Sequence, residues 1–163
     1  MKLAPLVPLL AVAALAGGAV AVGSVASAQA PAASTVTYTE LERGSTFVHV
    51  RNTRAKSPRA NAMGDQIVFT NRLGDTSGSV IGKLHVSCTT TVGARNFSKS
   101  TLVCEGVAVL RDGALTLQAT TRPGIRTTTG AVTGGTGAYA NARGVFVSRA
   151  GQGGAQTTIT LAG

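Results

Sequence analysis

A single polar residue interrupts an otherwise apolar strand face in the middle of the chain. Alternation along residues 67–73 places four side chains on one face: Ile67, Phe69, Asn71 and Leu73. A buried amide is costly unless its hydrogen bonds are satisfied. Asn71 is therefore either a structural residue bonded to neighbouring backbone or a polar group presented to a bound molecule, and the sequence leaves both interpretations open.

The two cysteines are spaced to face each other across a hairpin. Cys88 and Cys104 lie in adjacent strand-like runs, equally far from Asn96 in the connection between them. Directly opposed residues of an antiparallel pair have Cα atoms about 4.5–5.5 Å apart, which suits a disulfide. In an exported protein such a pair is oxidised, and closing so short a loop contributes roughly 3 kcal/mol. We predict a structural Cys88–Cys104 disulfide; the alternative is a reactive Cys88 thiolate.

Other catalytic arrangements find little support. His49 and His85, the only histidines, lie mid-strand without Cys, Asp or Glu at metal-ligand spacing, so we expect no metal site. Six acidic residues make a paired-carboxylate hydrolase hard to build, and Glu40 and Glu42, which share a strand face, are typical of solvated charges. No serine lies in a G-x-S-x-G setting. We therefore expect no cofactor.

The elements that must position these residues are strands. No stretch shows helical periodicity, and turn signals occur at Asp112-Gly113, 75–78 and 151–154. Runs rich in Val, Thr, Ile, Leu and Phe recur at roughly ten-residue spacing, at 35–41, 45–51, 65–73, 79–91, 100–110, 114–121, 127–133, 144–149 and 155–161. Eight or nine short strands predict an all-β sandwich or barrel.

A glycine-rich segment precedes one of the last runs. Residues Thr133–Gly144 read TGGTGAYANARG, and Val145 begins an apolar strand. Gly134, Gly135 and Gly137 permit positive φ, which predicts a tight connection between strands. A phosphate-binding loop would need a following Gly-Lys-Ser/Thr and an amphipathic helix, and neither follows.

Three motifs together resemble one superfamily. The order GGTG, an aromatic residue two positions later and then Ala-Arg-Gly resembles the end of plant dirigent proteins, and a similar turn occurs in plant allene oxide cyclases. The segment Glu42–Ser45 is similar to the acidic-Arg-Gly-Ser start of those cyclases, and Gly64–Leu73 (GDQIVFTNRL) to their GD-x-x-x-FTN-K-L strand. The resemblance covers about Thr35 to Val147. It implies an all-β, eight-stranded antiparallel β-barrel with a largely apolar lumen, usually trimeric in plants.

The resemblance also implies a site. Its cyclases hold a flexible hydrophobic substrate in a productive shape with the help of a few polar groups. By motif, Asn71 matches the asparagine that holds an ordered water near the substrate oxygen, and Ser45 matches a serine of the family. The family's first-strand glutamate corresponds to Thr37 without a gap, or to Glu40 with a small one. The candidate catalytic residues are thus Asn71, Ser45 and Glu40, and the candidate cavity residues are Phe69, Ile67 and Asn71.

Departures from the family pattern leave the activity open. Thr46 replaces a proline after Ser45, the run 103–110 lacks a tyrosine found in the cyclases, and dirigents carry an aspartate where this chain has Asn71. A disulfide would also remove Cys88, which the resemblance places at a cavity cysteine. Two hypotheses remain: a cofactor-free isomerase, cyclase or stereochemical guide for a small hydrophobic molecule, or a non-catalytic carrier or cell-envelope module.

The N-terminus is typical of a secretory signal peptide. Lys2 precedes about twenty apolar residues and a region of small residues. We expect cleavage after Ala28, leaving residues 29–34 as a flexible leader and 35–163 as one β-barrel domain of a secreted protein. The alternative is an uncleaved membrane anchor. Heavy use of Ala, Gly and Arg suggests a bacterial genome.

The charge balance is basic, with a formal net charge of +9. Nucleic-acid binding normally brings stacking aromatics or a groove-entering helix, and the six Phe and Tyr residues are scattered through strand-like runs, so we expect no nucleic-acid partner. The expected partner is a small hydrophobic ligand. An anionic envelope surface stays open as a partner of the basic segment 51–59, as does a further copy of the chain.

Overall fold

The computed structural model describes residues 34–52 and 61–162. The predicted signal peptide, nearly all of the leader and most of the basic segment lie outside the described residues. Within these ranges the chain forms eight strands and one short 3-10 helix, η1 (Phe97–Lys99). The strands are β1 (Thr35–Val50), β2 (Gln66–Gly74), β3 (Val80–Val92), β4 (Thr101–Leu110), β5 (Gly113–Thr121), β6 (Thr127–Gly137), β7 (Gly144–Gly151) and β8 (Gly154–Leu161).

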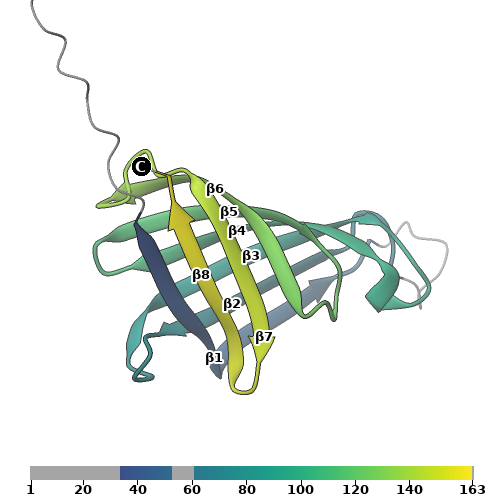
Figure 1. Cartoon of the computed structure of the whole chain (residues 1–163). Helices are drawn as coiled ribbons and strands as arrows, with labels where there is room; N and C mark the ends of the chain where they lie inside the picture. The colour runs from purple at the N-terminus through teal and green to yellow at the C-terminus, as the bar shows by residue number, and fades with distance from the viewer. Residues whose placement is uncertain (1–33, 53–60, 163) are drawn as a thin grey trace, which may run out of the picture.

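Each strand pairs antiparallel with the next, and β8 closes the sheet on β1, with Thr35 opposite Thr160 (Figure 1). The predicted eight-stranded antiparallel β-barrel is confirmed. Closure leaves no unpaired strand edge, so the backbone polar groups of the sheet are satisfied within it. The three predicted hairpin turns are present; the first centres one residue earlier than expected, because Leu110 pairs directly with Gly113.

The first two predicted strands are one strand with a bulge. Leu41 lies opposite Arg72 and Thr46 opposite Thr70, so β1 carries more residues than β2 across this interval. The bulge contains Gly44, with φ of 83°, and the Ser45 hydroxyl, which donates to the Leu41 carbonyl at 3.0 Å. Because the number of extra residues in β1 is odd, side chains that would face inward before the bulge correspond to positions that face outward after it.

The β3–β4 hairpin is symmetric, as the cysteine spacing predicts. Cys88 lies directly opposite Cys104, and the two form a disulfide with Cα atoms 3.9 Å apart. The predicted disulfide is therefore confirmed, and the described chain contains no free cysteine.

The glycine-rich segment forms the end of β6 rather than a turn alone. Gly134, Gly135 and Gly137 belong to the strand, and the connection to β7 begins at Ala138. A Cβ on Gly135 would clash with the Tyr139 carbonyl oxygen. The glycines thus allow the β6–β7 connection to fold back closely on the barrel end.

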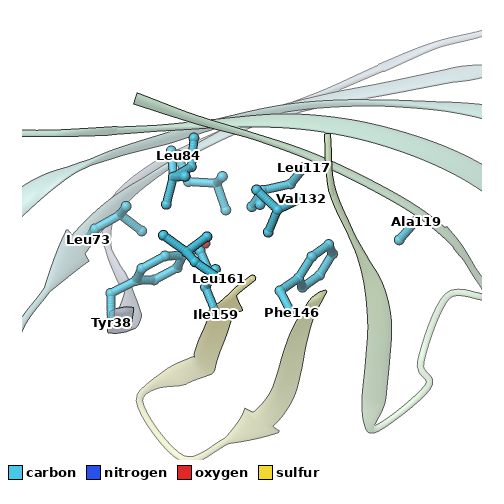
Figure 2. Close-up of a cluster of buried hydrophobic side chains, with 11 residues drawn as sticks. Tyr38, Leu73, Leu84, Leu117, Ala119, Val132, Phe146, Ile159 and Leu161 are labelled. Atoms are coloured by element: carbon cyan, nitrogen blue, oxygen red, sulfur yellow. The ribbon is translucent and has the colours of Figure 1, made fainter. Parts of the chain in front are cut away.

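Side chains fill the barrel interior unevenly. One large cluster occupies the half nearest the β2–β3, β4–β5 and β6–β7 connections. Figure 2 shows its side chains pointing toward one another from opposite sides of the barrel; the largest fully buried apolar ones are Tyr38, Leu73, Leu115 and Ile159. The second cluster is smaller and contains Ile67, Cys88 and Leu102. We call these halves the packed half and the open half.

Candidate functional site

The open half contains a cavity of about 300 Å³. Its mouth lies at the end of the barrel that carries the β3–β4 and β5–β6 connections, since Phe97, Arg122 and Pro123 line it. Its walls are mostly apolar and include Ile67 and Phe69 from β2 and both disulfide cysteines. The alternation predicted for residues 67–73 holds, because Ile67 and Leu73 are buried while Val68 is exposed.

A carboxyl group lies among these apolar walls. Glu40 lines the cavity, and its Oε2 accepts a hydrogen bond of 2.6 Å from the Asn71 side-chain amide. Burial raises the pKa of Glu40 above its ordinary value, and the hydrogen bond from Asn71 and the nearby Thr157 hydroxyl only partly offset this. A carboxyl group in such a cavity can give a proton when it is protonated and take one when it is ionised.

Two hydroxyl groups complete the polar cluster. Tyr38 and Thr157 are opposite each other on β1 and β8, are 1% and 2% exposed, and both line the cavity. Neither hydroxyl has a hydrogen-bond partner of good geometry among the described residues. Burial, and then the charge of Glu40, raise the pKa of Tyr38, so its phenol stays protonated. Buried hydroxyls without partners are rare and suit a bound polar group.

The predicted site residues fall into two places. Glu40 and Asn71 are brought together, although Asn71 reaches the cavity through Glu40 and is not itself among its lining residues. Ser45 is exposed in the β1 bulge, bonded to backbone, and the structure does not bring it to the other two. Thr37 is exposed on the outer face, so the inward-facing position of the first strand belongs to Glu40.

The expectation for Glu40 is wrong, and the sequence did not point to Tyr38 or Thr157. Glu40 is not a solvated charge sharing a face with Glu42, because the bulge starts between them and leaves Glu42 exposed while Glu40 is partly buried. Tyr38 and Thr157 did not stand out in the sequence. Alternation with Glu40 could have placed Tyr38 on the inner face, but nothing local indicates that Thr157 lies opposite it.

The aspartate of the GD-x-x-x-FTN motif, Asp65, has a structural role. Asp65 is buried and accepts hydrogen bonds from the backbone N–H groups of Asn52 (2.7 Å) and Ala62 (3.1 Å). Its Oδ2 lies 3.4 Å from Nε2 of His49. Burial opposes ionisation, but these N–H groups and His49 outweigh it and lower the pKa of Asp65. The motif thus joins the end of β1 to the start of β2 near the cavity mouth.

Among residues 34–52 and 61–162, no three His, Cys, Asp or Glu side chains group in a way that could hold a metal ion. No helix in the same ranges is long and apolar enough to cross a membrane.

Solved structures share this architecture. A pyocyanin demethylase superposes with a TM-score of 0.64 at 21% identity, over 78% of this chain and 99% of its own. A pterocarpan synthase dirigent protein gives 0.58 at 15% identity, over 79% and 88%. An exo-specific intermolecular Diels-Alderase gives 0.51 at 16% identity, over 80% and 98%. No protein-family model and no curated protein sequence matches the chain.

The chain therefore has the barrel fold of the allene oxide cyclase and dirigent-like proteins, as its motifs indicate. At these identities the likeness establishes the fold, and the chemistry has to be argued from the cavity itself.

Proposed function

We propose that the barrel binds a small, largely apolar molecule in the open half and guides its cyclisation or isomerisation, with Glu40 as the proton-transferring group. The observation that supports this most directly is the Glu40 carboxyl group inside the apolar cavity, hydrogen-bonded to Asn71 at 2.6 Å. Related folds among the solved structures include a dirigent protein and Diels-Alderases.

Each group has a chemical part in this proposal. The apolar walls restrict a flexible molecule to few conformations, which removes entropy from the barrier. Glu40, when protonated, gives a proton to a ligand oxygen and, when ionised, takes one from carbon or oxygen. The Tyr38 and Thr157 hydroxyls donate hydrogen bonds to a ligand oxygen on which negative charge develops. Asn71 acts on Glu40 as a positioning residue.

A generic proton-abstraction probe tests the base. Ionised Glu40 would remove the C3 proton of 5-nitrobenzisoxazole while the ring N–O bond breaks, releasing a coloured cyanophenolate. We expect Glu40→Gln to lower this rate by about 100-fold, the lower range of general-base contributions. Glu42→Gln is the matched control, an exposed glutamate two positions along the same strand, and should leave the rate unchanged. Equal rates for the two variants would contradict a basic role for Glu40.

A non-catalytic carrier would use the same cavity, and the partnerless Tyr38 and Thr157 hydroxyls suit binding as well as chemistry. Native mass spectrometry of the purified protein detects a co-purified molecule, and chromatography of the released molecule separates the two functions, because isomers have equal mass. A carrier yields the same compound from the wild type and from Glu40→Gln, whereas an isomerase or cyclase yields an unreacted isomer only from the variant.

A further inference from the structure

The cavity mouth contains a cation held on a short turn. Arg122 and Pro123 follow β5 directly and both line the cavity. The Ile125 N–H donates to the Arg122 carbonyl at 3.3 Å, and the Thr121 and Thr128 hydroxyls bond across the strand pair at 2.9 Å. Pro123 fixes one backbone torsion of the turn. The backbone of Arg122 is therefore held at the mouth of the cavity.

The guanidinium group of Arg122 is unpaired within the part of the chain that the structure describes. It makes no hydrogen bond or ion pair with any residue in the described ranges, and its side chain is exposed. Among the described residues that line the cavity, Arg122 is the only cation and Glu40 the only acid. Five N–H donors are thus available where a molecule would pass between solvent and cavity.

Glu40 and Arg122 lie in different parts of the cavity. Glu40 lies near the Tyr38 and Thr157 hydroxyls, and all three residues are in the middle of strands. Arg122, by contrast, lies in the connection between β5 and β6. An anionic group placed beside Glu40 would be repelled by the ionised carboxylate and would lose its hydration among apolar walls. The same group at the mouth would meet a guanidinium suited to bidentate binding of carboxylate or sulfonate.

We propose that the ligand is an amphipathic organic anion, whose apolar body enters the open half and whose carboxylate-like group pairs with Arg122 at the mouth. This inference rests on the proposed function, because it names the class of molecule for the same cavity. Arg122 would determine which ligand binds and in which orientation. It would keep the anionic end of the ligand at the mouth and direct the other end toward Glu40.

A matched pair of fluorescent probes tests the proposal. 8-Anilinonaphthalene-1-sulfonate and N-phenyl-1-naphthylamine share an aromatic body, and only the first carries a sulfonate. We expect the sulfonate probe to bind wild-type protein more tightly, and Arg122→Leu to weaken it by about tenfold, as loss of a charge-assisted hydrogen bond does. Binding of the neutral probe should change by less than about twofold, and 1 M salt should remove the preference of the wild type.

Arg126→Leu is the control, because Arg126 is an exposed arginine of the same connection that does not line the cavity. It should leave both probes unaffected. A cavity-filling change, Ala119→Trp or, where that variant does not fold by circular dichroism, Ser148→Trp, should abolish binding of both probes.

The outcomes separate the two proposals. If neither probe binds, or both bind as well in the filled variant, the ligand cavity itself is refuted. If the neutral probe binds in the cavity but the sulfonate brings no gain, or Arg126→Leu weakens the sulfonate probe as much as Arg122→Leu, the cavity stands and the role of Arg122 is overturned.

Discussion

The packed half and the open half of the barrel are built from the same strands but differ in how completely side chains fill the interior. In the packed half, Leu73, Leu115 and Ile159 are fully buried and meet across the lumen. In the open half, the same strands enclose a cavity of about 300 Å³. Where it meets the packed half, its walls carry a carboxyl group and the Tyr38 and Thr157 hydroxyls, which have no hydrogen-bond partner among the described residues. A fold selected for stability alone would fill that space and pair those groups. The difference is consistent with the proposal that the packed half maintains the barrel and the open half binds a ligand.

The largest expected effect compares one leucine from each half. Leu115→Ala, in the packed half, should lower the free energy of unfolding by about 3–4 kcal/mol, because it removes methyl groups from a filled core and leaves a new void. Leu102→Ala, beside the existing cavity, should cost about half as much, since Leu102 has fewer partner atoms to lose. Urea denaturation gives both values. Equal losses would mean that the two halves do not differ in packing.

The second-largest expected effect is the loss of stability when the Cys88–Cys104 disulfide is removed. It closes a loop with a sequence separation of 16 in the wall of the open half, where the core cluster is small. The double variant Cys88→Ser, Cys104→Ser should lose about 3 kcal/mol by the loop-entropy estimate. Denaturant unfolding of the variant and of the wild type with and without reductant measures this. A reduced wild type as stable as the oxidised form would show that the open half needs no cross-link.

A smaller effect tests how the two polar groups of the open half are coupled. Asn71→Leu removes the hydrogen bond that lowers the pKa of Glu40, so this pKa should rise further above its ordinary value. The pH profile of proton abstraction from 5-nitrobenzisoxazole should then move to higher pH, because Glu40 must be ionised to act as a base. Thr70→Leu, a change at the neighbouring strand position, should leave the profile in place. An unmoved profile in Asn71→Leu would show that Asn71 does not act on Glu40.

The smallest expected effect concerns stability and pH. Because the pKa of Glu40 is raised in the folded protein, its contribution favours folding most below the pKa of the unfolded chain and is lost as pH rises through the folded pKa. Glu40→Gln should therefore be more stable than wild type at neutral pH, by less than the change in Leu102→Ala, and lose this advantage in acid. Thermal unfolding at pH 4 and pH 8 measures it, with Glu42→Gln as the control. A destabilised Glu40→Gln at pH 8 would mean that the carboxylate supports the fold.

Local patterns made much of this structure predictable. Two-residue alternation located the strands and put Ile67 and Phe69 on an inner face, since the period of a strand is a local property. Hairpin symmetry paired Cys88 with Cys104, because partners across one short connection are set by that connection alone. The bulge in β1 was missed and split one strand into two, because an exchange of faces breaks the alternation that identifies a strand.

By itself the sequence determined the strands, the disulfide and the inward position of Asn71, each from residues near one another along the chain. Only the tertiary structure decided that Asn71 meets Glu40 and that Tyr38 faces Thr157, because those pairs depend on barrel closure and on the register shift after Leu41. The cavity also belongs to the tertiary level. Its volume is what remains after all eight strands have placed their side chains, and no single segment specifies that remainder.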